Sequence, residues 1–168
     1  ALTLRRPISI CDVTGDMLRL VFEVRGDGTR WLAGRTPGDA LDLLGPLGNG
    51  VFPLEAPDGA PVLLVGGGIG APPMLYAARN LNRAHAVLGF QTAAKAILFE
   101  DFCDACELVQ LTTDDGSLGA GGTVLGPIKL LLEQHTYAKI LACGPRPMLA
   151  ALAELARERG IPLFVSME

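Results

Sequence analysis

A four-residue apolar run that ends in glycines is the feature that most constrains this chain. Val62–Val65 is continuously apolar, four glycines stand within Gly66–Gly70, and an apolar pattern with helical spacing follows from Pro72. This order predicts a buried strand, a tight turn and the start of a helix. Glycine lets the backbone approach a ligand, and helix-start N–H groups favour a diphosphate. Such a turn is a weak motif alone, so a purely structural turn is the alternative.

The residues after this turn continue to alternate between strand and helix patterns. Five strands with helices between them predict a parallel sheet covered on both faces, a five-stranded α/β nucleotide-binding domain. The strand candidates are Val62–Val65, Ala84–Phe90, Glu107–Thr112, Lys139–Cys143 and Leu163–Ser166. The helix candidates are Pro72–Arg83, Ala93–Ala105, Gly122–Gln134 and Arg146–Arg159.

Three loops are predicted to meet at one edge of this sheet. Gly66–Gly70 follows the first strand, Thr113–Gly116 follows the third, and Cys143–Met148 follows the fourth. Ligands of open parallel sheets bind at the carboxyl ends of the strands. The agreement of the three loops is a stronger indication of a nucleotide site than any one of them.

The first third of the chain has a β-type pattern. Pro7–Val13, Met17–Val24 and Asp39–Leu44 are predicted to be extended, and Thr29–Ala33 is predicted to be a short helix capped by Thr29. A Pro- and Gly-rich stretch, Ala56–Pro61, predicts a hinge. We therefore expect two domains, residues 1–56 and 57–168.

Composition excludes several classes of function. A net charge of −4 and a pI near 5.2 argue against a nucleic-acid surface. No stretch approaches the ~20 apolar residues that span a membrane, and the chain does not start with a long apolar segment typical of a signal peptide. The four scattered cysteines are predicted to be reduced, in a cytoplasmic protein. The Cys103/Cys106 pair offers two ligands where clusters usually take four, so no metal site is predicted.

Two short segments of the first domain could contact an anion. Arg6 and Ser9 stand three residues apart on a segment stiffened by Pro7, and arginine suits phosphate because its fork is bidentate and always charged. Gly28 and Thr29 begin the predicted short helix. The alternatives are a solvated surface arginine and an ordinary hairpin turn.

The motifs together resemble one family, the electron-transfer subunit of class B dihydroorotate dehydrogenase in the ferredoxin reductase superfamily. The similarity runs from about residue 4 to the last residue. It rests on RPISICD at 6–12, FEVRGDGT at 22–29, GPLGNG at 45–50, VGGGIGAPP at 65–73, TTDDGSLG at 112–119, ACGPRPML at 142–149 and GIPLFVSME at 160–168.

The resemblance implies a fold and a set of cofactor contacts. The implied fold is a partial flavin-binding β-barrel followed by the α/β domain. The residues implied to bind FAD are Arg6, Pro7, Ile8, Ser9, Phe22, Glu23, Val24, Gly28 and Thr29. Those implied to surround NAD(H) are Gly66, Gly67, Gly68, Ile69, Gly70, Thr113, Asp114, Cys143, Gly144 and Pro145. Cys143 is implied to border the hydride path as the one catalytic candidate, with a small buried residue as the alternative.

The sequence also departs from the family pattern. Ile8 stands where many members have an aromatic residue. The first barrel strands and the cysteines of the family's 2Fe-2S domain are not found, so the chain resembles the core of the subunit. The implied function, in pyrimidine biosynthesis, is electron transfer from NADH through FAD toward an iron–sulfur centre and a partner dihydroorotate dehydrogenase in a hetero-oligomer. The alternatives are another NAD(P)H:flavin oxidoreductase of the superfamily, or a nucleotide-binding module that is inactive alone.

Overall fold

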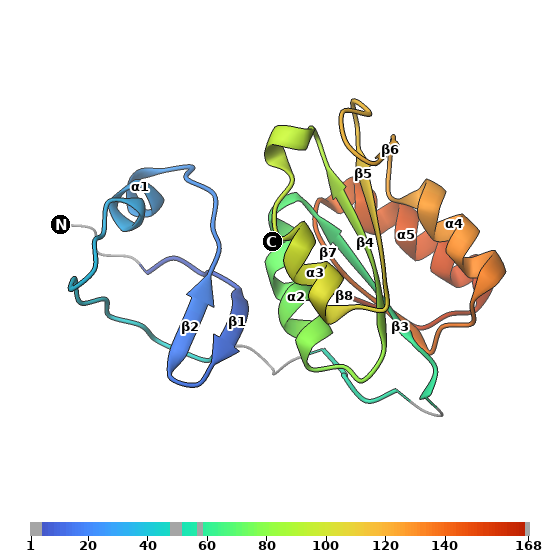
Figure 1. The fold of residues 1–168 in the computed structure, drawn as a ribbon, viewed down its shortest axis with the longest axis horizontal. Coiled ribbons are helices and arrows are strands. Elements are labelled where there is room, and N and C mark those ends of the chain that lie inside the picture. The colour runs from blue at the N-terminus through green and yellow to red at the C-terminus, as the bar shows by residue number, and fades with distance from the viewer. Residues whose placement is uncertain (1–4, 48–51, 57–58, 167–168) are drawn as a thin grey trace.

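The computed structural model describes residues 5–47, 52–56 and 59–166. Figure 1 shows a small N-terminal part with a hairpin and one helix beside a larger layered α/β part. The described N-terminal elements are β1 (Ile10–Thr14), β2 (Met17–Leu20) and α1 (Asp27–Ala33). The fold class expected from the sequence is confirmed, with a small antiparallel sheet standing for the partial barrel.

The larger part is built on a parallel sheet of six strands in the order β6-β5-β4-β3-β7-β8. Its strands are β3 (Val62–Gly67), β4 (Ala84–Phe90), β5 (Leu108–Thr113), β6 (Ala120–Gly121), β7 (Lys139–Cys143) and β8 (Leu163–Ser166). The chain moves outward from β3 in one direction to β4, β5 and β6, and then crosses to β7 and β8. The point of reversal, between β3 and β7, is where open α/β sheets bind ligands.

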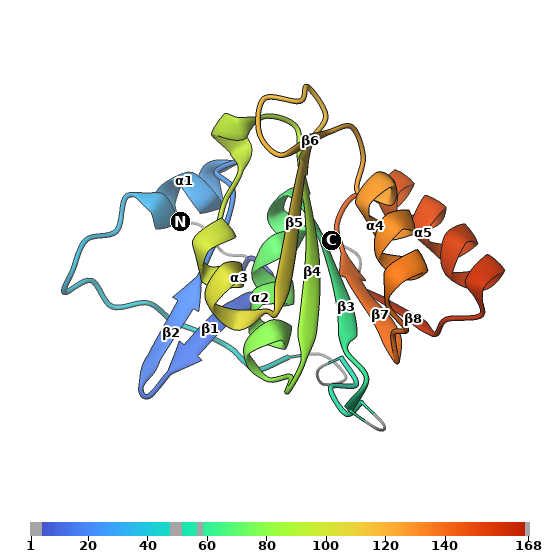
Figure 2. The ribbon, with the colours of Figure 1, turned by 45° about the vertical axis from the view of Figure 1, so that its right-hand side comes forward.

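Helices cover both faces of the sheet, as Figure 2 shows. One face carries α2 (Ala71–Arg79) and α3 (Phe99–Ala105), and the other carries α4 (Leu125–Gln134) and α5 (Arg146–Arg159). The central strands β3 and β7 are buried on both sides, which explains why their sequences are apolar runs without alternation.

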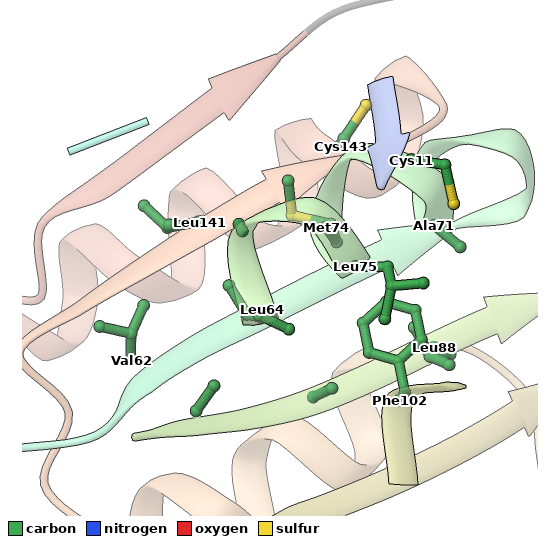
Figure 3. Packing of buried hydrophobic residues seen from close by; sticks show 14 of the residues in the cluster. Cys11, Val62, Leu64, Ala71, Met74, Leu75, Leu88, Phe102, Leu141 and Cys143 are labelled. Atoms are coloured by element: carbon green, nitrogen blue, oxygen red, sulfur yellow. The ribbon is translucent and has the colours of Figure 1, made fainter. Parts of the chain in front are cut away.

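Each face has its own hydrophobic core. The hairpin-side core packs Leu64 and Leu88 of the sheet against Leu75 of α2 and Phe102 of α3 (Figure 3). It also takes in Cys11 of β1, which is fully buried. The far-side core lies under α4 and α5 and contains alternate residues of β3, Leu63 and Val65. Cys11 therefore places the β1–β2 hairpin against the α/β part.

The structure corrects several details of the predicted elements. The sheet has six strands rather than five, because β6 is only two residues long and leaves no apolar run. Residues 39–44 form no strand, and Leu43 and Leu44 are exposed. The predicted helix Ala93–Ala105 is a 3-10 turn, Ala93–Lys95, followed by α3 from Phe99. The GPLGNG segment lies partly outside the described residues, as does the centre of the predicted hinge.

Thr29 was expected to cap α1 but occupies its third position, with Gly26 at the cap. Its hydroxyl accepts hydrogen bonds from the N–H groups of Arg25 at 2.9 Å and Gly26 at 3.1 Å. Thr29 thus stabilises the start of α1 by reaching back toward the cap.

None of the helices in the described ranges has the length and apolar character needed to cross a membrane.

Candidate functional site

The glycine turn lies at the reversal point of the sheet. β3 ends at Gly67, a 3-10 turn covers Gly68–Gly70, and α2 starts at Ala71 with Pro72 and Pro73 in its first turn. Proline suits this position because the first N–H groups of a helix have no intrahelical partner. The predicted strand, turn and helix are therefore confirmed.

Two of the glycines allow the turn to pack against the loop after β7. A Cβ on Gly67 would lie 2.7 Å from the sulfur of Met148 and 2.8 Å from Pro145. A Cβ on Gly70 would overlap the carbonyl of Cys143 and lie 2.7 Å from the nitrogen of Gly144. The absence of side chains at Gly67 and Gly70 thus serves contact between two loops.

Gly68 differs from its neighbours. Its backbone is left-handed, with φ of +54°, and a Cβ added there would meet nothing within 4 Å. The residue is half-buried. Open space above a left-handed glycine at the carboxyl edge of a parallel sheet is a cradle in which a diphosphate could approach the backbone.

The loop after β5 lies against the end of β4. The N–H of Asp114 donates to the carbonyl of Phe90 at 3.0 Å, and that of Asp115 donates to the carbonyl of Gln91 at 3.3 Å. Thr113 is buried, and its hydroxyl bonds to the backbone of Leu118 at 2.9 and 3.0 Å, so it shapes the loop. Asp114 and Asp115, both exposed, therefore lie beside the end of β4, and the carboxylate of Asp115 accepts hydrogen bonds from the N–H and the hydroxyl of Ser117.

Cys143 ends β7 at the same edge. Its side chain is 1% exposed and belongs to the hairpin-side core, where Figure 3 shows it near Met74 and Cys11. Gly144 follows with φ of +156° and packs against Gly67. The buried position fits packing of the thiol, and a role for Cys143 beside the nicotinamide stays a prediction.

In the N-terminal part, the structure brings Arg6 and Gly28 together. A Cβ on Gly28 would lie 2.8 Å from Nε of Arg6, so the guanidinium is seated against the first turn of α1. Arg6, Pro7 and Ser9 are exposed, and Ile8 is half-buried. The segment predicted to hold the flavin thus lies, through Arg6, against the start of α1, whose first turn also carries Asp27.

The prediction that the strand beside the flavin continues to Val24 is wrong, because β2 ends at Leu20 and residues 22–24 form no strand. Phe22 is half-buried and Val24 is exposed. A carboxylate oxygen of Glu23 lies 2.7 Å from the guanidinium of Arg25, and the other lies 3.8 Å from Nζ of Lys95. Glu23 therefore connects the N-terminal part to the turn that follows β4.

Lys139 is a structural residue that the sequence prediction missed. It starts β7, is 7% exposed, and its Nζ donates to the carbonyls of Pro53, at 2.8 Å, and Glu55. It ties the segment before β3 to the sheet. The one feature of the sequence that could have indicated this role is a lysine as the first residue of an otherwise apolar strand.

At the opposite edge of the sheet, His85 lies in a polar cluster. His85 is 4% exposed, its Nδ1 lies 2.8 Å from the Tyr137 hydroxyl, and its Nε2 lies 3.5 Å from Glu107. The ring of His135 lies edge-on at 4.8 Å. The carboxylate can only accept, so we assign the imidazole proton to Nε2 and the Tyr137 hydroxyl as donor to Nδ1.

This cluster predicts a loss of stability in acid. Burial, and then the charge of His135, lower the pKa of His85. When the pH falls below the ordinary histidine pKa of about 6.5, His85 is protonated in the unfolded chain but stays neutral in the folded chain. The free energy of unfolding should therefore fall with decreasing pH. Denaturant titrations of the wild type and His85→Asn between about pH 7 and pH 5.5 check this. The variant should show the shallower dependence; equal slopes would contradict the assignment.

Comparison with known proteins agrees with this architecture. No protein-family model matches the chain. Among solved structures, the NADH-dependent reduced ferredoxin-NADP oxidoreductase has a TM-score of 0.83 and is 32% identical, covering 98% of this chain and 60% of that one. The flavohemoglobin of Malassezia yamatoensis, which has bound FAD and heme, shares the fold at a TM-score of 0.69 and 18% identity, covering 92% of this chain and 45% of that one. The fold is thus that of the ferredoxin reductase-like flavoproteins.

Sequence relatives narrow the resemblance further. The chain is 44% identical over 172 residues to the electron transfer subunit of dihydroorotate dehydrogenase B (NAD(+)) from Bacillus caldolyticus, and 41% identical over 174 residues to that from Shouchella clausii. These matches cover 98% and 99% of the chain, and the chain spans about 65% of the length of each relative. The chain therefore resembles the core of this electron-transfer subunit, as expected from its motifs.

Proposed function

We propose that this chain binds FAD and NADH and passes electrons from NADH through FAD toward an iron–sulfur centre and a catalytic dihydroorotate dehydrogenase subunit, with which it forms a hetero-oligomer. The observation that carries this proposal is the 44% identity to an electron transfer subunit over 98% of the chain. Two cofactor cradles, Arg6 against the start of α1 and the turn at Gly68, are compatible with this proposal, since both lie in the part of the chain that the match covers.

The geometry of the cradles is compatible with both cofactors. Arg6, seated on the start of α1, would hold the FAD diphosphate with charge-assisted hydrogen bonds. Gly68 would leave room for the NADH diphosphate. Bound FAD would supply the chemistry, accepting a pair of electrons from NADH and releasing them singly. The protein orients the two cofactors, and the mechanism requires no protein nucleophile or general base.

The charges beside β4 support a proposal on nicotinamide specificity. A 2′-phosphate usually needs a nearby cation, and residues 91–95 offer only Lys95, which lies 3.8 Å from Glu23. The exposed carboxylates of Asp114 and Asp115 stand beside this position. They would repel a 2′-phosphate and accept hydrogen bonds from a free ribose, so we infer a preference for NADH. Parallel calorimetric titrations with NADH and NADPH test it; equal affinities would contradict it.

Electron transfer from NADH through FAD also requires an electron acceptor. Within residues 5–47, 52–56 and 59–166, no three His, Cys, Asp or Glu side chains are grouped to hold a metal ion. We therefore propose transfer to an iron–sulfur centre outside these residues. Reduction of a supplied 2Fe-2S ferredoxin would favour the second candidate, a ferredoxin-linked oxidoreductase like the 32% identical structure. Association with a catalytic dihydroorotate dehydrogenase subunit in a pull-down would favour the first.

The flavin contact gives a direct prediction. Arg6→Ala should weaken FAD binding by about 1.5–3 kcal/mol, the range for hydrogen bonds to charged groups. Titration of the apoprotein with FAD measures it. Arg30→Ala, which removes another exposed arginine of the same region that is paired with Asp27, is the control and should leave the Kd unchanged. An unchanged Kd in Arg6→Ala would remove Arg6 from the site.

A further inference from the structure

A network of four charges joins the hairpin to the α/β part. Asp12 of β1 lies 3.1 Å from the guanidinium of Arg79, which lies 3.3 Å from Asp101. Arg19 of β2 contacts both oxygens of Asp101, at 2.5 and 3.2 Å. Asp12 and Arg19 are opposite each other in the hairpin. The charges alternate in sign along the series Asp12, Arg79, Asp101 and Arg19, so the two central side chains, Arg79 and Asp101, each have an opposite charge on either side.

The network is positioned by the elements that carry it. Arg79 is the last residue of α2 and Asp101 lies in the first turn of α3. Each charge complements the dipole of its helix end, which favours these residue types there. Asp12 and Asp101 have side chains only 12% and 23% exposed, so water screens this network less than the Arg83–Glu107 pair, whose side chains are 49% and 44% exposed.

Cys11 adds an apolar anchor to the charged one. It immediately precedes Asp12 and is fully buried. Its side chain packs in the hairpin-side core, in the same cluster as Met74 and Leu75 of α2. One residue of β1 thus enters the core while the next enters the ion-pair network. A bulge between Ile10 and Asp12 in the hairpin accompanies this arrangement.

The two elements that meet here begin at the two cofactor cradles. β1 starts directly after Arg6–Ser9, the segment proposed to hold the flavin, and α2 starts directly after Gly68–Gly70, the turn proposed to hold NADH. A displacement of β1 along α2 would therefore change the separation of the two cradles. Hydride transfer requires reacting atoms about 3–3.5 Å apart, so this separation controls the rate.

We propose that Asp12, Arg79, Asp101 and Arg19 form an interdomain ion-pair network that fixes the flavin-bearing strand relative to the nicotinamide-binding turn. Arg79 is its central positioning residue, because it contacts both carboxylates. The effect of the network on electron transfer rests on the proposed function, whereas the effect of the network on the position of β1 does not depend on any cofactor.

The first arm of the test measures the position of β1 without cofactors. Burial raises the pKa of the Cys11 thiol, so its alkylation is expected to be slow, whereas Cys103 is exposed. In Arg79→Gln, peptide-resolved alkylation of Cys11 should be about tenfold faster, because two partly buried carboxylates lose their shared partner. Arg83→Gln breaks an ion pair within the α/β part and should leave the Cys11 rate unchanged. An unchanged Cys11 rate in Arg79→Gln overturns the proposal.

The second arm measures the consequence for the cofactors. In stopped-flow experiments on the FAD-loaded chain, Arg79→Gln should slow hydride transfer from NADH roughly 10- to 100-fold, the scale of a misplaced cofactor. It should also weaken the flavin–nicotinamide charge-transfer absorbance, while the Kd values for FAD and NADH stay within about twofold, since no proposed ligand is changed. Faster Cys11 alkylation with an unchanged transfer rate would overturn the positioning role. A wild-type chain that binds no FAD would contradict the proposed function, and the Cys11 arm would still decide whether the network fixes β1.

Discussion

Replacing Gly68 with valine should weaken NADH binding about 100-fold or more, equivalent to about 2.7 kcal/mol. The side chain would enter the open space at the carboxyl edge of the sheet, where the backbone is proposed to meet the diphosphate. Valine is also β-branched and adopts a φ of +54° poorly, so part of the effect will be backbone strain. Calorimetry with NADH, with circular dichroism to monitor the fold, measures the change.

Gly15→Val separates strain from ligand contact. Gly15 has φ of +58° and, like Gly68, would carry a Cβ that meets nothing within 4 Å, but it lies in the turn between β1 and β2. The two variants should lose similar folding stability, by the roughly 1–3 kcal/mol typical of a strained residue. Only Gly68→Val should lose NADH. Normal NADH affinity in that variant would mean that Gly66–Gly70 is a structural turn alone.

Gly70→Ala should lower the free energy of unfolding by about 1–3 kcal/mol or more, as overpacking does. Gly70 has an ordinary φ of −77°, so strain in its own backbone is not the cause. The added Cβ would overlap the carbonyl of Cys143 and crowd the nitrogen of Gly144. Both are backbone atoms of the loop after β7 and cannot rotate away as a side chain would. Urea denaturation measures the loss.

The matched control for that variant is Gly126→Ala. Gly126 lies within α4, and a Cβ there would meet nothing within 4 Å. Alanine is a better helix former than glycine, and Gly126 is the second residue of the helix, so this variant should be neutral or more stable by at most about 0.5–1 kcal/mol. Equal stability of Gly70→Ala and the wild type would show that the β3 and β7 loops are not packed as described.

The parts of this fold that the sequence predicted well are those set by local pattern. Val62–Val65 and Ala84–Phe90 are apolar runs because parallel strands are buried on both faces, and both were predicted as strands. The segment Asp39–Leu44 mixes two aspartates with three leucines and was also predicted as a strand, but it pairs with no described strand and its leucines are exposed. Pattern indicates which residues favour a strand, but formation of a sheet requires a partner.

In the candidate site, too, some features could be predicted from the sequence and others could not. The loops after β3, β5 and β7 were placed at one edge from strand order alone, since topology fixes that arrangement. The family resemblance implied only that Arg6 and Gly28 each bind FAD, and their contact with each other was not predicted. The pairing of Arg19 with Asp101, 82 residues apart, has no local signature, because nothing near either residue specifies its partner.

The central claim is that this chain moves electrons from NADH to FAD. Anaerobic titration of the FAD-loaded protein with NADH, followed by the flavin absorbance, tests it most directly. We expect the protein to retain FAD after desalting and about one equivalent of NADH to bleach it, since both carry two electrons. A protein that retains no FAD, or a bound flavin that keeps its colour in excess NADH, would contradict it.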